Sequence, residues 1–438
     1  MIISFSPKKF FSGESVMKES PSFQSFPLLC SAATMKDALT PKGRQPKEVE
    51  ASDLGVWEGF CGPLTGLLPY ITPLSSCGNR PLEFTFHNQI YTLVYFHAEE
   101  YSSGRALLED VNDPEQSPPE GLPQDGLGRG TFFEALHSRG LAQMFETFER
   151  LSCRAAKALG TKYDKFGPLS ALDGSLIDAT LSMEWADYSQ STKKAKVHLC
   201  FDLQSGIPRQ IILTEGKGAE RPAADSHLET ETTGVMDRGY QDHQRFDAWQ
   251  NEDKYFVCRI RNNTQRTIVQ ELPLPEKSPV FFFAEVYLGD EQHRTQNSLR
   301  LVGFKVGKKV FWVATNRRDL KAQEIAFIYR LRWEIETFFA WWKKHLNVYH
   351  LIARSPYGVM MQLLSGLITY LLIVIYFNWR YSDGPSLLRL RELRRNIRRE
   401  RAILSFKTSL RGNRFMMFLL TTVSRGTWKK QTIIIAIF

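Results

Sequence analysis

The chain has 438 residues, a length that indicates two to four domains rather than one compact core. Its apolar fraction of 43% and charged fraction of 24% are those of an ordinary folded protein. The formal charge of +9 favours polyanionic partners without choosing among them. The six cysteines form no C-x-x-C pair, so neither a disulfide framework nor a structural zinc site is expected.

The N-terminal part of the chain divides into two segments. Residues 1–83 are rich in Ser, Pro and Gly without sustained periodicity, and we interpret them as a poorly ordered leader. Helical patterning over residues 84–162 predicts a small helical domain. Such domains often hold DNA-binding helix-turn-helix units, and we assign a DNA-binding role to it, although a bundle without DNA contact fits the sequence equally well.

From Leu169 the apolar pattern changes to that of strands separated by turns. Helical patterning returns at Leu320 and continues to about Trp379. This order predicts an α/β catalytic core over residues 163–380 with a β-rich insertion at about 241–318. The strand-like segments are 169–182, 194–204, 208–215, 232–240, 254–261, 266–272, 279–288, 299–306 and 308–316.

Two features of the C-terminal part have alternative interpretations. The segment Val359–Phe377 is long enough to span a bilayer, but polar residues such as Gln362 interrupt it, and we interpret it as a buried core helix. Residues 381–438 form a basic C-terminal region with seven arginines between Arg389 and Arg401. Such density is typical of a surface that binds a phosphate backbone, and it is also found on solvated basic helix faces.

The most informative segment is 328–346, IYRLRWEIETFFAWWKKHL. On a continuous helix at about 100° per residue, Tyr329, Arg332, Glu336 and Lys343 share one narrow face, opposite a wide apolar stripe. A carboxylate can hold a divalent metal, whereas Arg and Lys bind phosphates. The combination favours metal-assisted phosphoryl transfer. Glu334 falls away from this face and is excluded as a metal ligand.

The spacing Tyr-x2-Arg-x3-Glu-x6-Lys resembles the YREK signature of the IS-four family of bacterial insertion-sequence transposases, a DDE family whose catalytic core is ribonuclease H-like. In that family one Asp lies on the first strand, a second follows a later strand, and the Glu lies on a helix after an insertion. Asp173 in ALDGSLID and Asp237 in VMDRGY match the two aspartates. Asp178 is the alternative to Asp173, but on a regular strand it points to the opposite face.

The resemblance implies roles for individual residues. Asp173, Asp237 and Glu336 would hold two Mg²⁺ ions, with Mn²⁺ as a substitute, and Tyr329, Arg332 and Lys343 would grip phosphates near the break. Separately, Trp312 occupies a position like that of the family tryptophan that stacks on a flipped base. A core tryptophan on a strand is an equally good interpretation of Trp312.

The function that the resemblance implies is cut-and-paste transposition. A homodimer would bind double-stranded DNA at terminal inverted repeats, cut it through a hairpin intermediate and join it to target DNA, in the bacterial cytoplasm and without a membrane. Two alternatives remain open at this point. One is a catalytically decayed copy that only binds DNA, and the other is a membrane-associated protein built on the segment Val359–Phe377.

Overall fold

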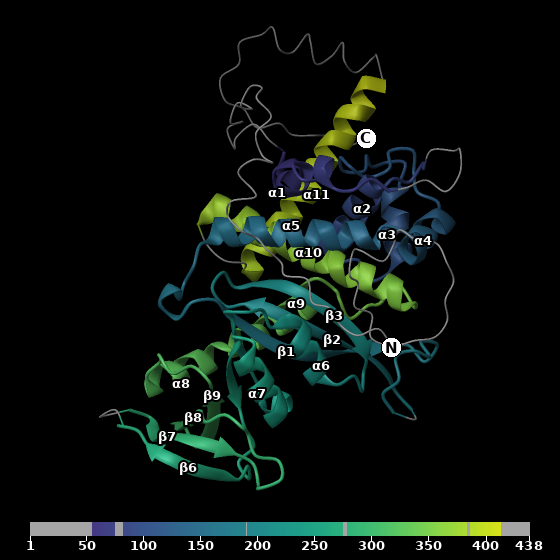
Figure 1. Cartoon of the computed structure of the whole chain (residues 1–438). Coiled ribbons are helices and arrows are strands. Elements are labelled where there is room, and N and C mark those ends of the chain that lie inside the picture. The colour runs from purple at the N-terminus through teal and green to yellow at the C-terminus, as the bar shows by residue number, and fades with distance from the viewer. Residues whose placement is uncertain (1–54, 75–81, 190, 275–277, 383–385, 413–438) are drawn as a thin grey trace, which may run out of the picture.

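The computed structural model describes residues 55–74, 82–189, 191–274, 278–382 and 386–412, with side chains as far as residue 406. Figure 1 shows three parts stacked on one another: a layer of helices, a twisted sheet with helices on both faces, and an extension of that sheet at the far end. The fold class expected from the sequence, an α/β core with a β-rich insertion and helices before it, is confirmed.

A single nine-stranded sheet in the order β3-β2-β1-β4-β5-β9-β8-β7-β6 runs through the molecule. In its core half, β4 lies parallel to both β1 and β5, whereas β2 is antiparallel to β1 and to β3. The strands are β1 (Leu169–Ala179), β2 (Lys193–Asp202), β3 (Ile207–Glu215), β4 (Thr233–Met236), β5 (Tyr255–Arg259), β6 (Arg266–Glu271), β7 (Val280–Leu288), β8 (Leu299–Val306) and β9 (Lys309–Thr315).

The expected insertion contains strands that pair in two different ways. Strands β6 to β9 form an antiparallel meander, and β9 joins it to the core by pairing with β5. Helix α7 (His243–Asn251) and β5 fall within the range 241–318, yet they belong to the core, because β5 is parallel to β4 and α7 packs beside it. The strands that pair only within the meander therefore start after Arg259; strand patterning alone does not reveal which strands pair.

The two faces of the core sheet are covered by different helices. Helices α6 (Glu220–His227) and α7 pack on one face with Leu172 of β1. On the other face α8 (Ala322–Leu331) and α9 (Trp333–His345) pack in the cluster that contains Ala171 and Ile177. Because side chains alternate along a strand, Asp173 lies on the same face as Ala171 and therefore points toward α9.

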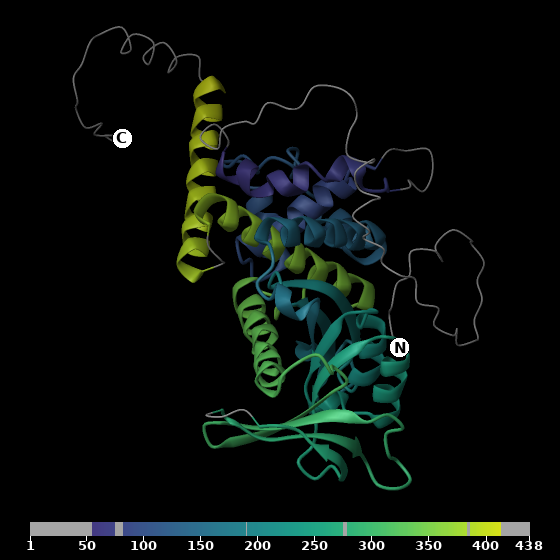
Figure 2. The ribbon, with the colours of Figure 1, turned by 60° about the vertical axis from the view of Figure 1, so that its left-hand side comes forward.

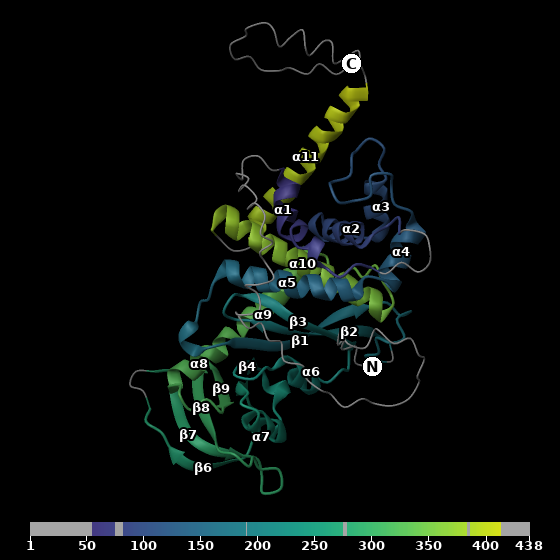
Figure 3. The same cartoon turned by 45° about the horizontal axis from the view of Figure 1, so that its top comes forward.

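The helical layer contains helices from both ends of the chain, side by side in Figures 1 and 3. The helices of the expected N-terminal domain, of the end of the core and of the C-terminal region thus pack in one layer. Within the expected leader of residues 1–83, α1 begins at Val56; residues 1–54 and 75–81 lie outside the described residues. The layer comprises α1 (Val56–Thr65), α2 (Phe86–Ala98), α3 (Gly104–Val111), α4 (Arg129–Ser138), α5 (Leu141–Leu159), α10 (Pro356–Tyr381) and α11 (Leu387–Gly412).

Helix α10 explains why this layer joins distant parts of the chain. Its residues from Gly358 to Phe377 are all buried, including Gln362 and Ser365. A helix that is apolar all round needs neighbours on every side, and here these are α1, α2, α4, α5 and the sheet. Among the described residues α10 alone is long and apolar enough to cross a membrane, and its most apolar stretch is entirely buried. The expectation of a buried core helix is confirmed.

Candidate active site

Asp173 lies in the middle of β1 with a side chain that is 21% exposed. Its Oδ1 accepts the backbone N–H of Gly174 at 2.9 Å, and its Oδ2 lies 3.5 Å from the guanidinium of Arg332. Burial raises the pKa of Asp173 to about 6, and the charges of Glu220 and Glu336 add to that rise against the opposing effect of Arg332. Asp173 thus carries a proton more readily than an exposed aspartate does.

Asp237 directly follows the last residue of β4. In the parallel register Met236 of β4 pairs with Cys258 of β5. The residues that follow them, Asp237 and Arg259, therefore lie beside one another. The Arg259 guanidinium is 3.5 Å from Asp237 Oδ1, and the Tyr329 hydroxyl donates to the same oxygen at 3.4 Å. Tyr329 is itself buried. It therefore links the end of β4 to helix α8.

Glu336 lies in the first turn of α9 and completes the group. The Arg332 guanidinium donates to Glu336 Oε1 at 2.5 Å and faces Asp173 with its other nitrogen. One guanidinium therefore stands between a carboxylate from β1 and a carboxylate from α9. The Arg332 guanidinium also lies 5.9 Å from the centroid of the Tyr329 ring, and Tyr329 in turn contacts Asp237. Asp173, Asp237 and Glu336, which come from three separate elements, are thereby linked through Arg332 and Tyr329.

The predicted continuous helix over 328–346 is in fact two helices. Arg332 ends α8 and precedes α9, and the surrounding hydrogen bonds are of the tighter i to i+3 kind, with Arg332 N–H to the Tyr329 carbonyl and Ile335 N–H to the Arg332 carbonyl, both 3.2 Å. The polar face is also packed against the sheet rather than solvated, because Tyr329, Arg332 and Lys343 are all buried. Glu334 accepts the Tyr163 hydroxyl at 3.2 Å, away from this group.

Two predicted residues lie apart from the carboxylates. Lys343 is two turns beyond Glu336, where its ammonium donates to the carbonyl of Leu176 in β1. Burial lowers the pKa of Lys343 to about 8, and the positive charge of Lys194 acts in the same direction. Asp178, the alternative to Asp173, has a 73% exposed side chain and pairs with Lys194 at 3.0 Å. The geometry therefore favours Asp173 as the member of the group from β1.

Trp312 lies on β9, in the insertion. Its ring meets the rings of Phe281 and Phe282 edge-on at centroid distances of 5.4 and 5.2 Å. The Arg266 guanidinium covers it at 3.7 Å from the ring centroid. Trp312 is thus packed within the insertion sheet. Trp333, beside Arg332, is by contrast 66% exposed.

The donor set can be tested for its fit to a divalent cation. Carboxylates from three elements, 21%, 34% and 36% exposed, are hard oxygen donors that solvent reaches. The mutual repulsion that contributes to the raised pKa of Asp173 is the kind of strain that a bound cation relieves. The described part of the chain holds no closed group of three His, Cys, Asp or Glu side chains able to hold a metal ion. The three carboxylates are of the chemical type that binds a divalent cation, while the Arg332 guanidinium lies between two of them, Asp173 and Glu336.

Sequence reasoning missed two neighbours of this site. Arg259 could have been found only from the pairing of β4 with β5. Glu220, at the start of α6, pairs with Lys196 at 2.7 Å. An ideal Cβ on Gly174 or Gly239 would lie 3.5 or 2.2 Å from a Glu220 carboxylate oxygen, so these two glycines leave room for it beside the aspartates. No spacing signal in the sequence marks Glu220.

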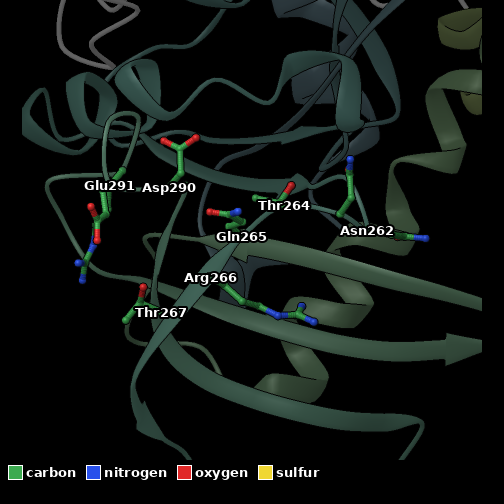
Figure 4. Close-up of a pocket in the computed structure, with 10 residues that line it drawn as sticks. Asn262, Thr264, Gln265, Arg266, Thr267, Asp290 and Glu291 are labelled. Carbon is green, nitrogen blue, oxygen red and sulfur yellow. The ribbon is translucent and has the colours of Figure 1, made fainter.

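Two connected hollows run from Asp237 along the insertion. The first, of about 470 Å³, is lined by Asp237, Arg238, Gly239, Arg261, Asn262 and Asn263. The second, of about 510 Å³, shares the two asparagines and continues between the loops before β6 and after β7. Figure 4 shows its labelled side chains, among them Arg266 and Asp290, lining an open polar surface.

Comparison with known proteins agrees with this arrangement. Residues 164–372, which include all three carboxylates, match the family model described as the transposase DDE domain. Over this stretch the chain is similar to DDE transposases. The match begins just before β1 and ends within α10, so the sheet, its insertion and the α8–α9 pair all lie inside it.

Curated proteins similar to this chain carry names of the same kind. The probable transposase for insertion sequence element IS5377 of Geobacillus stearothermophilus is 27% identical over 221 residues, which are 49% of this chain and 57% of the relative. The putative transposase for insertion sequence element IS4SA of Synechocystis sp. is 26% identical, over 62% of this chain and 83% of the relative. A piggyBac transposase synaptic complex with hairpin DNA aligns with 85% of each chain at a TM-score of 0.41 and 10% identity.

Proposed function

We propose that this chain is a transposase that cleaves the ends of an insertion sequence and joins them to target DNA with the help of divalent metal ions. One observation carries the proposal. Asp173 from β1, Asp237 after β4 and Glu336 from α9 form one connected set of side chains through Arg332 and Tyr329. Burial raises the pKa of Asp173, and the charge of Glu336 adds to that rise, so holding Asp173 at this place costs stability, which supports a functional role.

Asp173, Asp237 and Glu336 are the residues that would hold the metal, for which Mg²⁺ is the proposed ion. Bound there, such ions activate the attacking oxygen and stabilise the leaving oxygen. Arg332 and Tyr329 supply a fork of N–H donors and a hydroxyl beside these carboxylates, suited to a phosphodiester oxygen. Lys343 is buried against β1, away from the carboxylates, so it would reach phosphates only farther along the DNA strand. This supports a positioning role for it.

The proposed reaction consists of displacements at phosphorus. In hydrolysis the oxygen of water bonds to phosphorus and the bond to the 3′ oxygen breaks, so that one proton passes to the new 3′ hydroxyl and the other to solvent. In strand transfer that 3′ hydroxyl attacks a second phosphodiester, and its proton passes to the oxygen that leaves. Attack on the opposite strand of the same end would form a hairpin, which the YREK spacing supports.

The partners proposed are double-stranded DNA at the element's inverted repeats and at the target. Pairing of two ends would need two copies of the chain, hence the proposed homodimer. The relatives' names as insertion-sequence transposases support this assignment. The buried state of α10 supports a protein that acts on DNA in the cytoplasm.

The decisive experiment compares Glu336→Gln with Glu334→Gln in a cleavage assay on DNA carrying the element's end. Both residues lie in the first turn of α9, but only Glu336 contacts Arg332, whereas Glu334 accepts from Tyr163. A lost metal ligand worth about 3 kcal/mol or more lowers the rate by about 100-fold or more, so Glu336→Gln should abolish cutting and Glu334→Gln should retain it. Equal cutting by both variants would contradict the role of Glu336. A wild-type chain that binds DNA but never cuts it would indicate a decayed copy.

A further inference from the structure

The arginines of α11 fall into two structurally different sets. Arg394 and Arg401 are 8% and 5% exposed. Arg394 donates to the carbonyls of Ala98 and His345 at 2.6 and 2.7 Å, and Arg401 pairs with Asp110 of α3. These two arginines fix α11 to the helical layer and to the end of α9. They are therefore not available to an external phosphate.

Arg391, Arg395 and Arg399 lie on an adjoining face of the same helix, and all three are exposed. At about 100° per residue they fall within about 80° of one another, whereas the buried Leu393 and Ile397 lie on the far side. Within the part of α11 whose side chains are described, none of the three is paired with a carboxylate. We call these three residues the α11 arginine face.

The acidic residues of α11 do not neutralise this face. Glu400 points to the other side, where it accepts the backbone N–H groups of Val56 and Trp57 at 3.1 and 2.9 Å. Glu392 lies about 20° beyond Arg399 at the edge of the face and forms no ion pair among the described residues. Arg398, at the other edge, is neutralised by Glu99 at 2.5 Å. Arg391, Arg395 and Arg399 thus form a row of like charges between these two edges, none of them held in an ion pair within the described part of the chain.

This face begins beside the catalytic helix. Arg394 of α11 bonds the carbonyl of His345, the last residue of α9, and the neighbouring Lys344 is exposed. Burial lowers the pKa of His345; Glu100 opposes this shift, while the charges of Lys344, Arg394 and Arg391 lower the pKa further. Positive charge therefore continues from the end of α9 onto α11, which Figure 2 shows standing along the side of the helical layer.

We propose that Arg391, Arg395 and Arg399, continued by Lys344, form a docking surface for the phosphate backbone of double-stranded DNA. The inference rests on the proposed function, since a DNA-cutting enzyme needs to hold the duplex beyond the cut. Residues four apart on a helix are about 6 Å apart along its axis. One DNA strand carries a phosphate about every 3.4 Å along the helix axis, so a row of arginines at this spacing can contact the phosphates of a strand.

A second copy of the chain is the less suitable occupant. A two-fold interface places the same patch on both partners, so it would bring three arginines against three arginines. Like charges facing one another oppose such association. A DNA backbone suits this face better, because contacts to phosphates hold a duplex whatever its sequence.

The test measures binding of the full chain, without divalent metal, to a 30-base-pair duplex of arbitrary sequence over a range of salt concentrations. The variant is Arg391→Gln/Arg395→Gln/Arg399→Gln, and its matched control carries Lys at the same three positions. Losing three phosphate contacts should reduce the slope of log K against log salt by about 2.7 and weaken binding by about 100-fold at 0.15 M salt. The Lys control should keep the slope, and circular dichroism melting should show all three chains folded.

An unchanged slope and affinity in the folded Gln variant would overturn the proposal. So would a change only in the sedimentation of the DNA-free protein, because it would assign the face to a second copy of the chain. The outcome is separate from that of the proposed function. A wild-type chain that never cuts DNA, with binding still lost in the Gln variant, would refute the enzyme and leave the docking surface in place.

Discussion

Replacing Asp173 with Asn should stabilise the metal-free protein at alkaline pH. The folded state raises the pKa of Asp173 from the ordinary 3.8 to about 6, chiefly through burial. A group whose pKa is higher in the folded state binds its proton more tightly there. The associated stability is fully present below about pH 4 and is lost as the pH rises through 6. Asn resembles the protonated acid, so the variant keeps this stability at every pH.

The size of the effect follows from the shift. A difference of about two pKa units corresponds to about 3 kcal/mol in the free energy of unfolding. At pH 8 the variant should therefore be more stable than the wild type by about 3 kcal/mol, and below pH 4 the two should be nearly equal. A divalent cation should reverse the order at pH 8, because metal at about 1,000 times its dissociation constant stabilises the wild type by about 4.1 kcal/mol.

The assay is guanidinium denaturation followed by tryptophan fluorescence and circular dichroism, from pH 4 to pH 8, in EDTA and then in excess Mg²⁺. Coincident transitions by the two probes are needed before free energies are compared. A variant less stable than the wild type at pH 8 in EDTA would refute the reasoning. So would a difference between the two proteins that does not change with pH, because the stabilisation would then not come from the carboxyl proton.

Three further substitutions test other parts of the account. Asp178→Asn should leave DNA cleavage within about twofold of wild type, and stability within about 0.5 kcal/mol, since it removes only an exposed ion pair with Lys194. Trp312→Ala should destabilise the insertion by about 3 kcal/mol in chemical denaturation, because the ring packs against two phenylalanines and Arg266. Leu367→Ala, in the middle of the fully buried α10, should lower the free energy of unfolding by about 2–5 kcal/mol in the same measurement. Neither the wild type nor this variant should partition into membranes.

Local patterns predicted most of the elements because their signal is local. The alternation along 169–182 reflects a strand buried on both faces, and the structure places β1 there. The amphipathic pattern of 328–346 likewise identified helices, but it did not show the break at Arg332. A single residue with i to i+3 hydrogen bonds changes neither the composition nor the period of such a segment.

What the sequence could not supply depends on long-range pairing. Arg259 lies beside Asp237 only because β4 and β5 run parallel in one register. The packing of α10 could not be predicted for the same reason, since α10 is buried by helices from the other end of the chain. The arginines of α11 show the limit most directly: composition treats Arg394 and Arg395 alike, yet one is buried against α2 and α9 and the other is exposed.

The charges at the candidate site also determine the order in which its ligands can bind. Three carboxylates and the guanidiniums of Arg332 and Arg259 leave one net negative charge when all are ionised. In that state the site repels a phosphodiester and attracts a cation. One divalent cation held by the carboxylates would reverse the sign of the site's net charge. Arg332 would then no longer be needed to neutralise Asp173 and Glu336. DNA should therefore engage the α11 arginine face without metal, and the carboxylate site only once metal is present.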